Sequence, residues 1–180
     1  MAYKQSKGER EFGDIEFEDD AGTKIDFEED YISMQTGGNN VLVVSGSLVG
    51  VATATPKTTI AIAGSVSANV TQINASSNNS NTYTVTATDY AIFCNTRPSF
   101  QGGINSALTI TLPTAATYPG RILVIKDAGG YSGTNTITVQ RAGSDTINGS
   151  ATSVDLPDSA GGAAKQFMSD GGTQWYEIGS

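Results

Sequence analysis

Apolar and acidic residues alternate twice near the N-terminus of this chain, and this pattern limits its fold more than any other feature. The segment Ile15-Glu16-Phe17-Glu18-Asp19-Asp20 recurs ten residues later as Ile25-Asp26-Phe27-Glu28-Glu29-Asp30. A period of two is typical of a β-strand with one apolar and one charged face. The Asp20-Ala21-Gly22 segment between the copies favours a turn. A ribbon of such short strands is marginally stable alone, so its apolar side needs another surface.

Strand-like segments continue along the chain, and no part of it has the periodicity of an amphipathic helix. Residues 31–35 predict a strand, and the continuous apolar run Val41-Leu42-Val43-Val44 predicts one that is buried on both faces. From residue 83 onward, candidate strands are separated by turn clusters, many of them rich in glycine. These candidates are residues 83–88, 90–95, 107–112, 121–126, 135–140, 153–156, 164–168 and 174–178. The pattern predicts an all-β fold.

The distribution of charge suggests how the chain is divided. Residues 1–31 contain eleven acids and four bases, whereas the rest of the chain contains seven acids and six bases. We interpret residues 1–12 as a flexible arm that either frays or orders on docking. Residues 13–55 predict an acidic stem of short interleaved strands, and residues 56–82 combine short strands with a Ser/Asn-rich linker. Residues 83–180 predict a C-terminal β-sandwich or jelly roll.

The supply of core-forming residues is small. Leu, Ile, Val and Phe number 37 of 180 residues, close to the share of roughly one fifth below which chains tend to stay unfolded. A β-protein with so thin a core has to close its sheet edges or share them, and identical copies are the readiest partners. We therefore expect a homo-oligomer.

Histidine is absent and Cys94 is the one cysteine, which removes many kinds of enzymatic site. Neither a Ser-His-Asp triad nor a His-ligated zinc can form, and one thiol cannot hold an iron–sulfur cluster. A net charge of −8 disfavours nucleic acid, which is bound through Lys and Arg. No stretch resembles a membrane helix or a signal segment. We expect a non-enzymatic protein without a cofactor, made in the cytoplasm, that binds neither nucleic acid nor membrane.

The acidic strands supply four candidates for charged contacts, Glu16, Glu18, Asp26 and Glu28. Three interpretations fit them: contact with a basic surface of a protein partner, a solvated strand face, or a calcium site. The spacing of an EF-hand loop is missing from the sequence. Several copies of this segment would repel one another, and a basic neighbour would relieve that repulsion.

A few other residues have both a functional and a structural interpretation. Trp175 and Tyr176 are adjacent in a strand, so they point to opposite faces, and at most one of them can form a sugar-stacking platform. We expect Trp175 in the core, because a small core tends to bury the single tryptophan. Cys94 lies in an apolar strand and is expected to be buried. Asp155 and Asp158 could form a glycosidase pair, but acids in loops are usually turn formers.

Two groups of motifs carry a resemblance to a known family. The first is Thr23-Lys24-Ile25-Asp26-Phe27-Glu28-Glu29-Asp30-Tyr31 with Thr36-Gly37-Gly38 and Val43-Val44-Ser45-Gly46-Ser47. The second includes Ile110-Thr111-Leu112-Pro113, Pro119-Gly120-Arg121, Lys126-Asp127-Ala128-Gly129-Gly130 and Asp170-Gly171-Gly172-Thr173-Gln174-Trp175-Tyr176. The first group resembles a strand–turn module of fibre-like and decoration proteins in tailed-bacteriophage virions. The second is similar to the C-terminal β-domain of phage fibre and head-fibre proteins.

The resemblance implies a homotrimer on the capsid surface of a phage particle, in contact with the major capsid protein. The chain has no repetitive shaft, which suits a capsid decoration protein or short head fibre better than a main tail fibre. The residues expected at trimer or docking contacts are Ile15, Phe17, Ile25, Phe27, Tyr31, Val41 and Val43. The alternative is a short tail-fibre or tail-tip protein that recognises host surface glycans, and a depolymerase is a third class.

Overall fold

The computed structural model describes residues 15–17, 20–75, 81–98, 106–159 and 162–180, and it confirms the all-β fold. The described residues form sixteen strands and one 3₁₀ turn, Ala115–Thr117. They include no helix of the length and apolarity needed to cross a bilayer. The chain divides into two compact units, Met1–Ser67 (unit 1) and Ala68–Ser180 (unit 2). The predicted arm, residues 1–12, lies outside the described residues.

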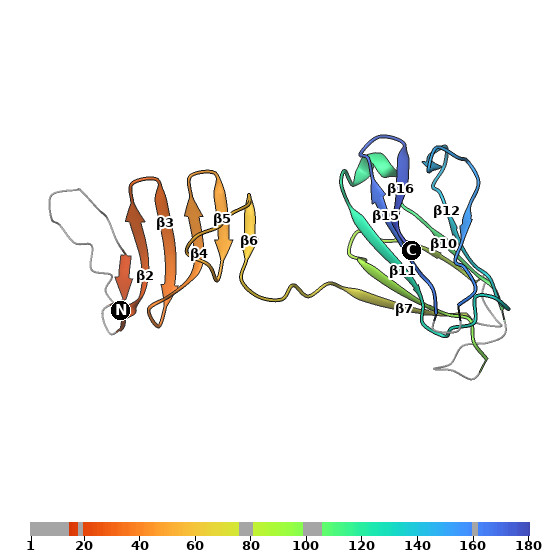
Figure 1. Ribbon diagram of the computed structural model, residues 1–180, viewed down its shortest axis with the longest axis horizontal. Helices are drawn as coiled ribbons and strands as arrows, with labels where there is room; N and C mark the ends of the chain where they lie inside the picture. The colour runs from red at the N-terminus through yellow and green to blue at the C-terminus, as the bar shows by residue number, and fades with distance from the viewer. Residues whose placement is uncertain (1–14, 18–19, 76–80, 99–105, 160–161) are drawn as a thin grey trace. The chain divides into compact units, whose positions relative to one another are not determined.

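Unit 1 contains one six-stranded sheet, sheet 1, in which the strands lie side by side in chain order (Figure 1). Neighbouring strands from β1 to β5 pair antiparallel, and β6 pairs parallel to β5. Short turns join β2 to β5 in succession, and Asp30, Gly38 and Gly46 in these turns have positive φ. The strands are β1 (Ile15–Phe17), β2 (Asp20–Glu28), β3 (Tyr31–Thr36), β4 (Asn39–Ser45), β5 (Leu48–Val51) and β6 (Ile60–Ile62).

Unit 2 contains two sheets. Sheet 2 has the order β14-β12-β10-β8, and sheet 3 has the order β13-β16-β15-β11-β9-β7. The strands are β7 (Val70–Asn74), β8 (Thr82–Thr84), β9 (Ala91–Asn95), β10 (Leu108–Thr111), β11 (Ile122–Asp127), β12 (Ile137–Gln140), β13 (Thr146–Ile147), β14 (Val154–Asp155), β15 (Ala164–Ser169) and β16 (Gln174–Gly179).

The chain winds between these two sheets strand by strand. From β7 to β12, successive strands alternate between sheet 3 and sheet 2, so neighbours within a sheet are two strands apart in sequence and pair in parallel. The antiparallel hairpin of β15 and β16 then joins sheet 3 beside β11. A jelly roll is built from antiparallel strands, so the parallel pairs distinguish unit 2 from that arrangement.

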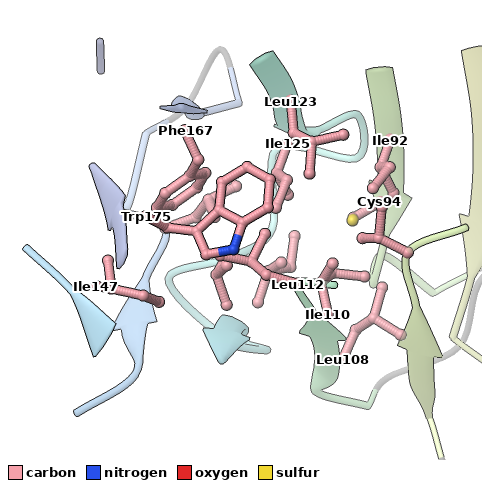
Figure 2. Close-up of a cluster of buried hydrophobic side chains, with 14 of the residues drawn as sticks. Ile92, Cys94, Leu108, Ile110, Leu112, Leu123, Ile125, Ile147, Phe167 and Trp175 are labelled. Atoms are coloured by element: carbon pink, nitrogen blue, oxygen red, sulfur yellow. The ribbon is translucent and has the colours of Figure 1, made fainter. Parts of the chain in front are cut away.

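Both sheets of unit 2 contribute to one hydrophobic core, which makes the unit a two-layer sandwich (Figure 2). Trp175 is fully buried in this core, and its indole N–H donates a hydrogen bond to the carbonyl oxygen of Pro113 at 3.0 Å. Cys94 is buried and free, and burial together with the nearby Asp127 raises the pKa of its thiol. The expected burial of Trp175 and Cys94 is confirmed.

The boundary between the units lies inside the segment interpreted as a linker. Of residues 56–82, β6 belongs to sheet 1, whereas β7 and the first residue of β8 belong to unit 2. These strands pair with β5, β9 and β10, and no local pattern encodes such pairings. The sequence pattern also missed β7, which is largely polar, and β13, which has only two residues.

A buried carboxylate links the two sheets at the start of unit 2. Asp89 accepts hydrogen bonds from the hydroxyl of Thr71 in β7 and from the hydroxyl of Tyr83 in β8, the latter at 2.8 Å. The backbone N–H and hydroxyl of Thr86 donate to the same carboxylate at 2.7 and 2.8 Å. Burial acts to raise the pKa of Asp89, but these hydrogen bonds outweigh it and hold the pKa below its ordinary value.

The lowered pKa of Asp89 makes the stability of unit 2 depend on pH. A carboxyl whose pKa is lower in the folded state stabilises the fold above its unfolded pKa of about 4, and this contribution is lost as the pH falls through the folded pKa. We expect Asp89→Asn to lower the free energy of unfolding by about 2 kcal/mol at pH 7. The difference from wild type should shrink between pH 5 and pH 2, measured by urea unfolding with Trp175 fluorescence. A difference independent of pH would contradict this role.

Candidate functional site

Sheet 1 places ten apolar residues on one face, in two rows that cross strands β2 to β6. Residues directly opposite each other in neighbouring strands project from the same face. The first row is Ile25, Met34, Leu42, Val51 and Ile62, and the second row is Phe27, Ile32, Val44, Val49 and Ile60. We call these ten residues the apolar face.

The apolar face is open to solvent in the single chain. None of the described strands of unit 1 forms a second layer over it. Ile32 and Met34 remain 40% and 41% exposed, and Ile60 remains 65% exposed. Large apolar patches are rare on monomers and mark interaction sites. Val41 and Val44 are also exposed, so the expectation that residues 41–44 are buried on both faces is wrong for the single chain.

The other face of sheet 1 is more polar and is partly covered by the chain itself. Its central row consists of Asp26, Ser33, Val43, Gly50 and Ala61. The connection between β5 and β6 passes close over this row, because a Cβ on Gly50 would lie 2.6 Å from the carbonyl oxygen of Thr53. Ser33 and Val43 are fully buried. The chain therefore covers the centre of the polar face and leaves the apolar face open.

Two of the acidic candidates, Asp26 and Glu28, lie on the polar face. Asp26 forms an ion pair with Lys24 at 3.2 Å and accepts a hydrogen bond from the side-chain amide of Gln35 at 3.4 Å. Glu28 is exposed two residues further along the same strand. Glu16 lies in β1, where its Cα pairs with that of Lys24. Glu18 lies outside the described residues.

The structure brings some of the residues predicted for trimer or docking contacts together on the apolar face. Ile25 and Phe27 are part of it, in adjacent rows. Ile15 and Phe17 lie in β1. The Cα of Ile15 pairs with that of Ile25, so β1 is the strand next to β2 at the edge of the sheet.

The other three predicted contact residues lie elsewhere. Tyr31 is on the polar face and accepts a hydrogen bond from the side-chain amide of Asn40 at 3.3 Å. Val43 is on the polar face as well, buried near the β5–β6 connection. Val41 is exposed at an irregularity in the pairing of β3 with β4, where it has no register partner. Strand alternation puts these residues on the side away from Ile25 and Phe27.

Eight residues of the apolar face were not among the predicted contacts. They are Ile32, Met34, Leu42, Val44, Val49, Val51, Ile60 and Ile62. The signal was present in the alternation of residues 31–35, 48–51 and 60–62. It becomes a site only when the register of each strand pair is known, because register decides which alternating sets share a face.

The apolar face is the main candidate contact surface among the described residues of unit 1. Among all residues that the structure describes, no group of three or more Cys, Asp or Glu residues could hold a metal ion. Tyr176 is 46% exposed on the strand that buries Trp175. Burying an exposed aliphatic or aromatic side chain gains about 1.5–3 kcal/mol, so the apolar face has a large capacity for association.

Comparison with known proteins adds two negative findings. No protein-family model matches the chain, and no curated protein sequence matches it. The interpretation of the site therefore depends on its geometry and on the sequence motifs.

Proposed function

We propose that this chain is a non-enzymatic structural protein of a bacteriophage particle, a homotrimeric capsid decoration protein or short head fibre. Unit 1 joins the copies and docks on the major capsid protein, and unit 2 is displayed. The resemblance of residues 23–47 and of the C-terminal motifs to phage virion proteins supports the class of particle.

The open apolar face is the observation that carries the proposal of self-association. Six of its ten side chains are exposed large hydrophobic residues. If each of these six gains about 1–1.5 kcal/mol on further burial, the face supplies about 6–9 kcal/mol per copy. This is comparable with the estimated cost of about 4–15 kcal/mol for lost translational and rotational freedom. Burial of this face can therefore offset much of the cost of association.

A threefold arrangement also distributes the charges favourably. With the apolar faces turned toward a common axis, Asp26 and Glu28 lie on the outward, polar faces of the three sheets. Like charges are then separated across the assembly, and they can meet a basic surface on the capsid. A closed ring also leaves no apolar face unpaired, whereas an open chain of contacts would polymerise.

Immunogold labelling of virions of the phage that encodes this chain tests the proposed location. An antibody against unit 2 is expected to label the surface of the head. Label confined to the tail would contradict the capsid proposal and favour the glycan-binding tail protein. Intact virions without label, with an unrelated antibody as the background control, would overturn a place on the particle surface.

A further inference from the structure

The outer faces of the two sheets of unit 2 differ in their content of apolar residues. The outer face of sheet 2 is a ladder of threonines, Thr82, Thr84, Thr109, Thr111 and Thr138. Gln140 donates a hydrogen bond to the hydroxyl of Thr111 at 2.7 Å, and the hydroxyl of Thr138 donates to Asp155 at 2.6 Å. Hydroxyl groups on such a surface can form hydrogen bonds with water, so this face is stable when exposed to solvent.

The outer face of sheet 3 carries more apolar residues, although Gln72 and Gln166 also lie on it, opposite Phe93 and Val124. It carries Val70, Phe93, Val124, Met168, Tyr176 and Ile178, which we call the outer patch. Val124 is half-buried, and the other five are exposed large hydrophobic residues. Among the described strand residues of this face, the charged one is Lys126, near the end of β11. Its side-chain ammonium donates a hydrogen bond to the carbonyl oxygen of Gly162. An apolar patch on one side of a sandwich whose other side is polar marks an interaction site.

We infer that the outer patch of each unit 2 packs against the outer patches of the other two copies, as a second interface of the trimer. This inference rests on the proposed self-association through unit 1. The partner is a second copy of this chain because the patch is uncharged over most of its area, so identical patches attract through burial without repulsion. Residues 68–180 contain seven acids and five bases, a net charge of only −2 per copy.

The short connection between the units favours this partner over a foreign one. Seven residues, 63–69, separate the end of β6 from the start of β7, and they span at most about 25 Å when extended. Once unit 1 is assembled, the three copies of unit 2 are held at an effective concentration on the order of millimolar. At this concentration, even a patch with weak affinity for its copies in the same trimer is bound to them most of the time. Val70, in the first strand after the connection, is itself part of the patch.

Cross-linking of introduced cysteines in the full chain tests the inference. The variants are Tyr176→Cys in the outer patch, Thr84→Cys on the outer face of sheet 2, and Met34→Cys on the apolar face of unit 1. The native Cys94 is buried and burial raises the pKa of its thiol, so wild type serves as the blank. Each variant is treated with a short bis-maleimide at micromolar protein and separated on a denaturing gel.

Tyr176→Cys is expected to give at least about fivefold more cross-linked dimer than Thr84→Cys, with no dependence on dilution. At a threefold axis only two of three cysteines can pair, so the dimer band should reach at most about two thirds of the protein. Cross-linking of Met34→Cys without cross-linking of Tyr176→Cys above the Thr84→Cys level would overturn the second interface and keep assembly through unit 1. Failure of both would overturn self-association itself. Cross-linking of Tyr176→Cys alone would support the outer patch and contradict the role of unit 1.

Discussion

Val44→Glu is expected to convert the proposed trimer into monomers. Val44 lies in the second row of the apolar face, between Ile32 and Val49 on the neighbouring strands. In a trimer assembled through this face, each copy would bury a carboxylate without a partner, at a cost of several kcal/mol per ion. A loss of about 3 kcal/mol already weakens association about a hundredfold. Light scattering coupled to gel filtration should report the chain mass of 18.6 kDa, against three times this mass for wild type.

The adjacent residue provides a matched control for this experiment. Ser45 follows Val44 in β4, and its register partners Tyr31 and Leu48 place it on the polar face. Ser45→Glu adds the same charge to the same strand and should remain trimeric. Fluorescence of Trp175, the one tryptophan, shows that unit 2 stays folded in both variants. A wild-type chain that is monomeric at about 10 µM, or a Val44→Glu variant that stays trimeric, would contradict assembly through the apolar face.

The apolar face also shows how much of the structure the sequence pattern can predict. The alternation of residues 25–28 predicted a strand with Ile25 and Phe27 on one side and Asp26 and Glu28 on the other, and the register of β2 with β3 agrees. The run of residues 41–44 predicted burial on both faces, yet Val44 is exposed in the single chain. A run of four apolar residues indicates that these side chains need apolar surfaces to pack against. It does not indicate whether the same chain or another copy provides those surfaces.

The C-terminal half shows a different limit. The sequence pattern predicted strands at residues 107–112 and 135–140, and the structure has β10 and β12 there. The pattern could not predict that β8, β10 and β12 share one sheet while β9 and β11 share the other. Pairing depends on contacts between distant segments, which local periodicity does not contain. The outer patch was missed for this reason, because it gathers residues from five strands of sheet 3.

Asp127→Ala is expected to cause the largest loss of stability in unit 2. The Asp127 side chain is fully buried at the end of β11, and it accepts four backbone hydrogen bonds from the turn that follows. The N–H groups of Gly129 and Gly130 donate to Oδ1 at 3.1 and 2.9 Å, and those of Tyr131 and Ser132 donate to Oδ2 at 2.8 and 2.9 Å. Each buried donor left without an acceptor costs about 1–3 kcal/mol, so the variant should lose about 3 kcal/mol or more.

Asp170→Ala is the matched control for this loss. Asp170 organises a similar turn, with Oδ1 accepting from the N–H groups of Gly172 and Gln174 at 2.7 and 3.0 Å, but its side chain is exposed. Water can replace the missing acceptor there, so the loss should stay below about 1 kcal/mol. Both variants are unfolded in urea at one protomer concentration, because association would otherwise shift the midpoints. The two sites differ in burial and in the number of backbone donors, four at Asp127 and two at Asp170. Equal losses would contradict the expectation that the buried carboxylate of Asp127 stabilises its turn more strongly than the exposed carboxylate of Asp170.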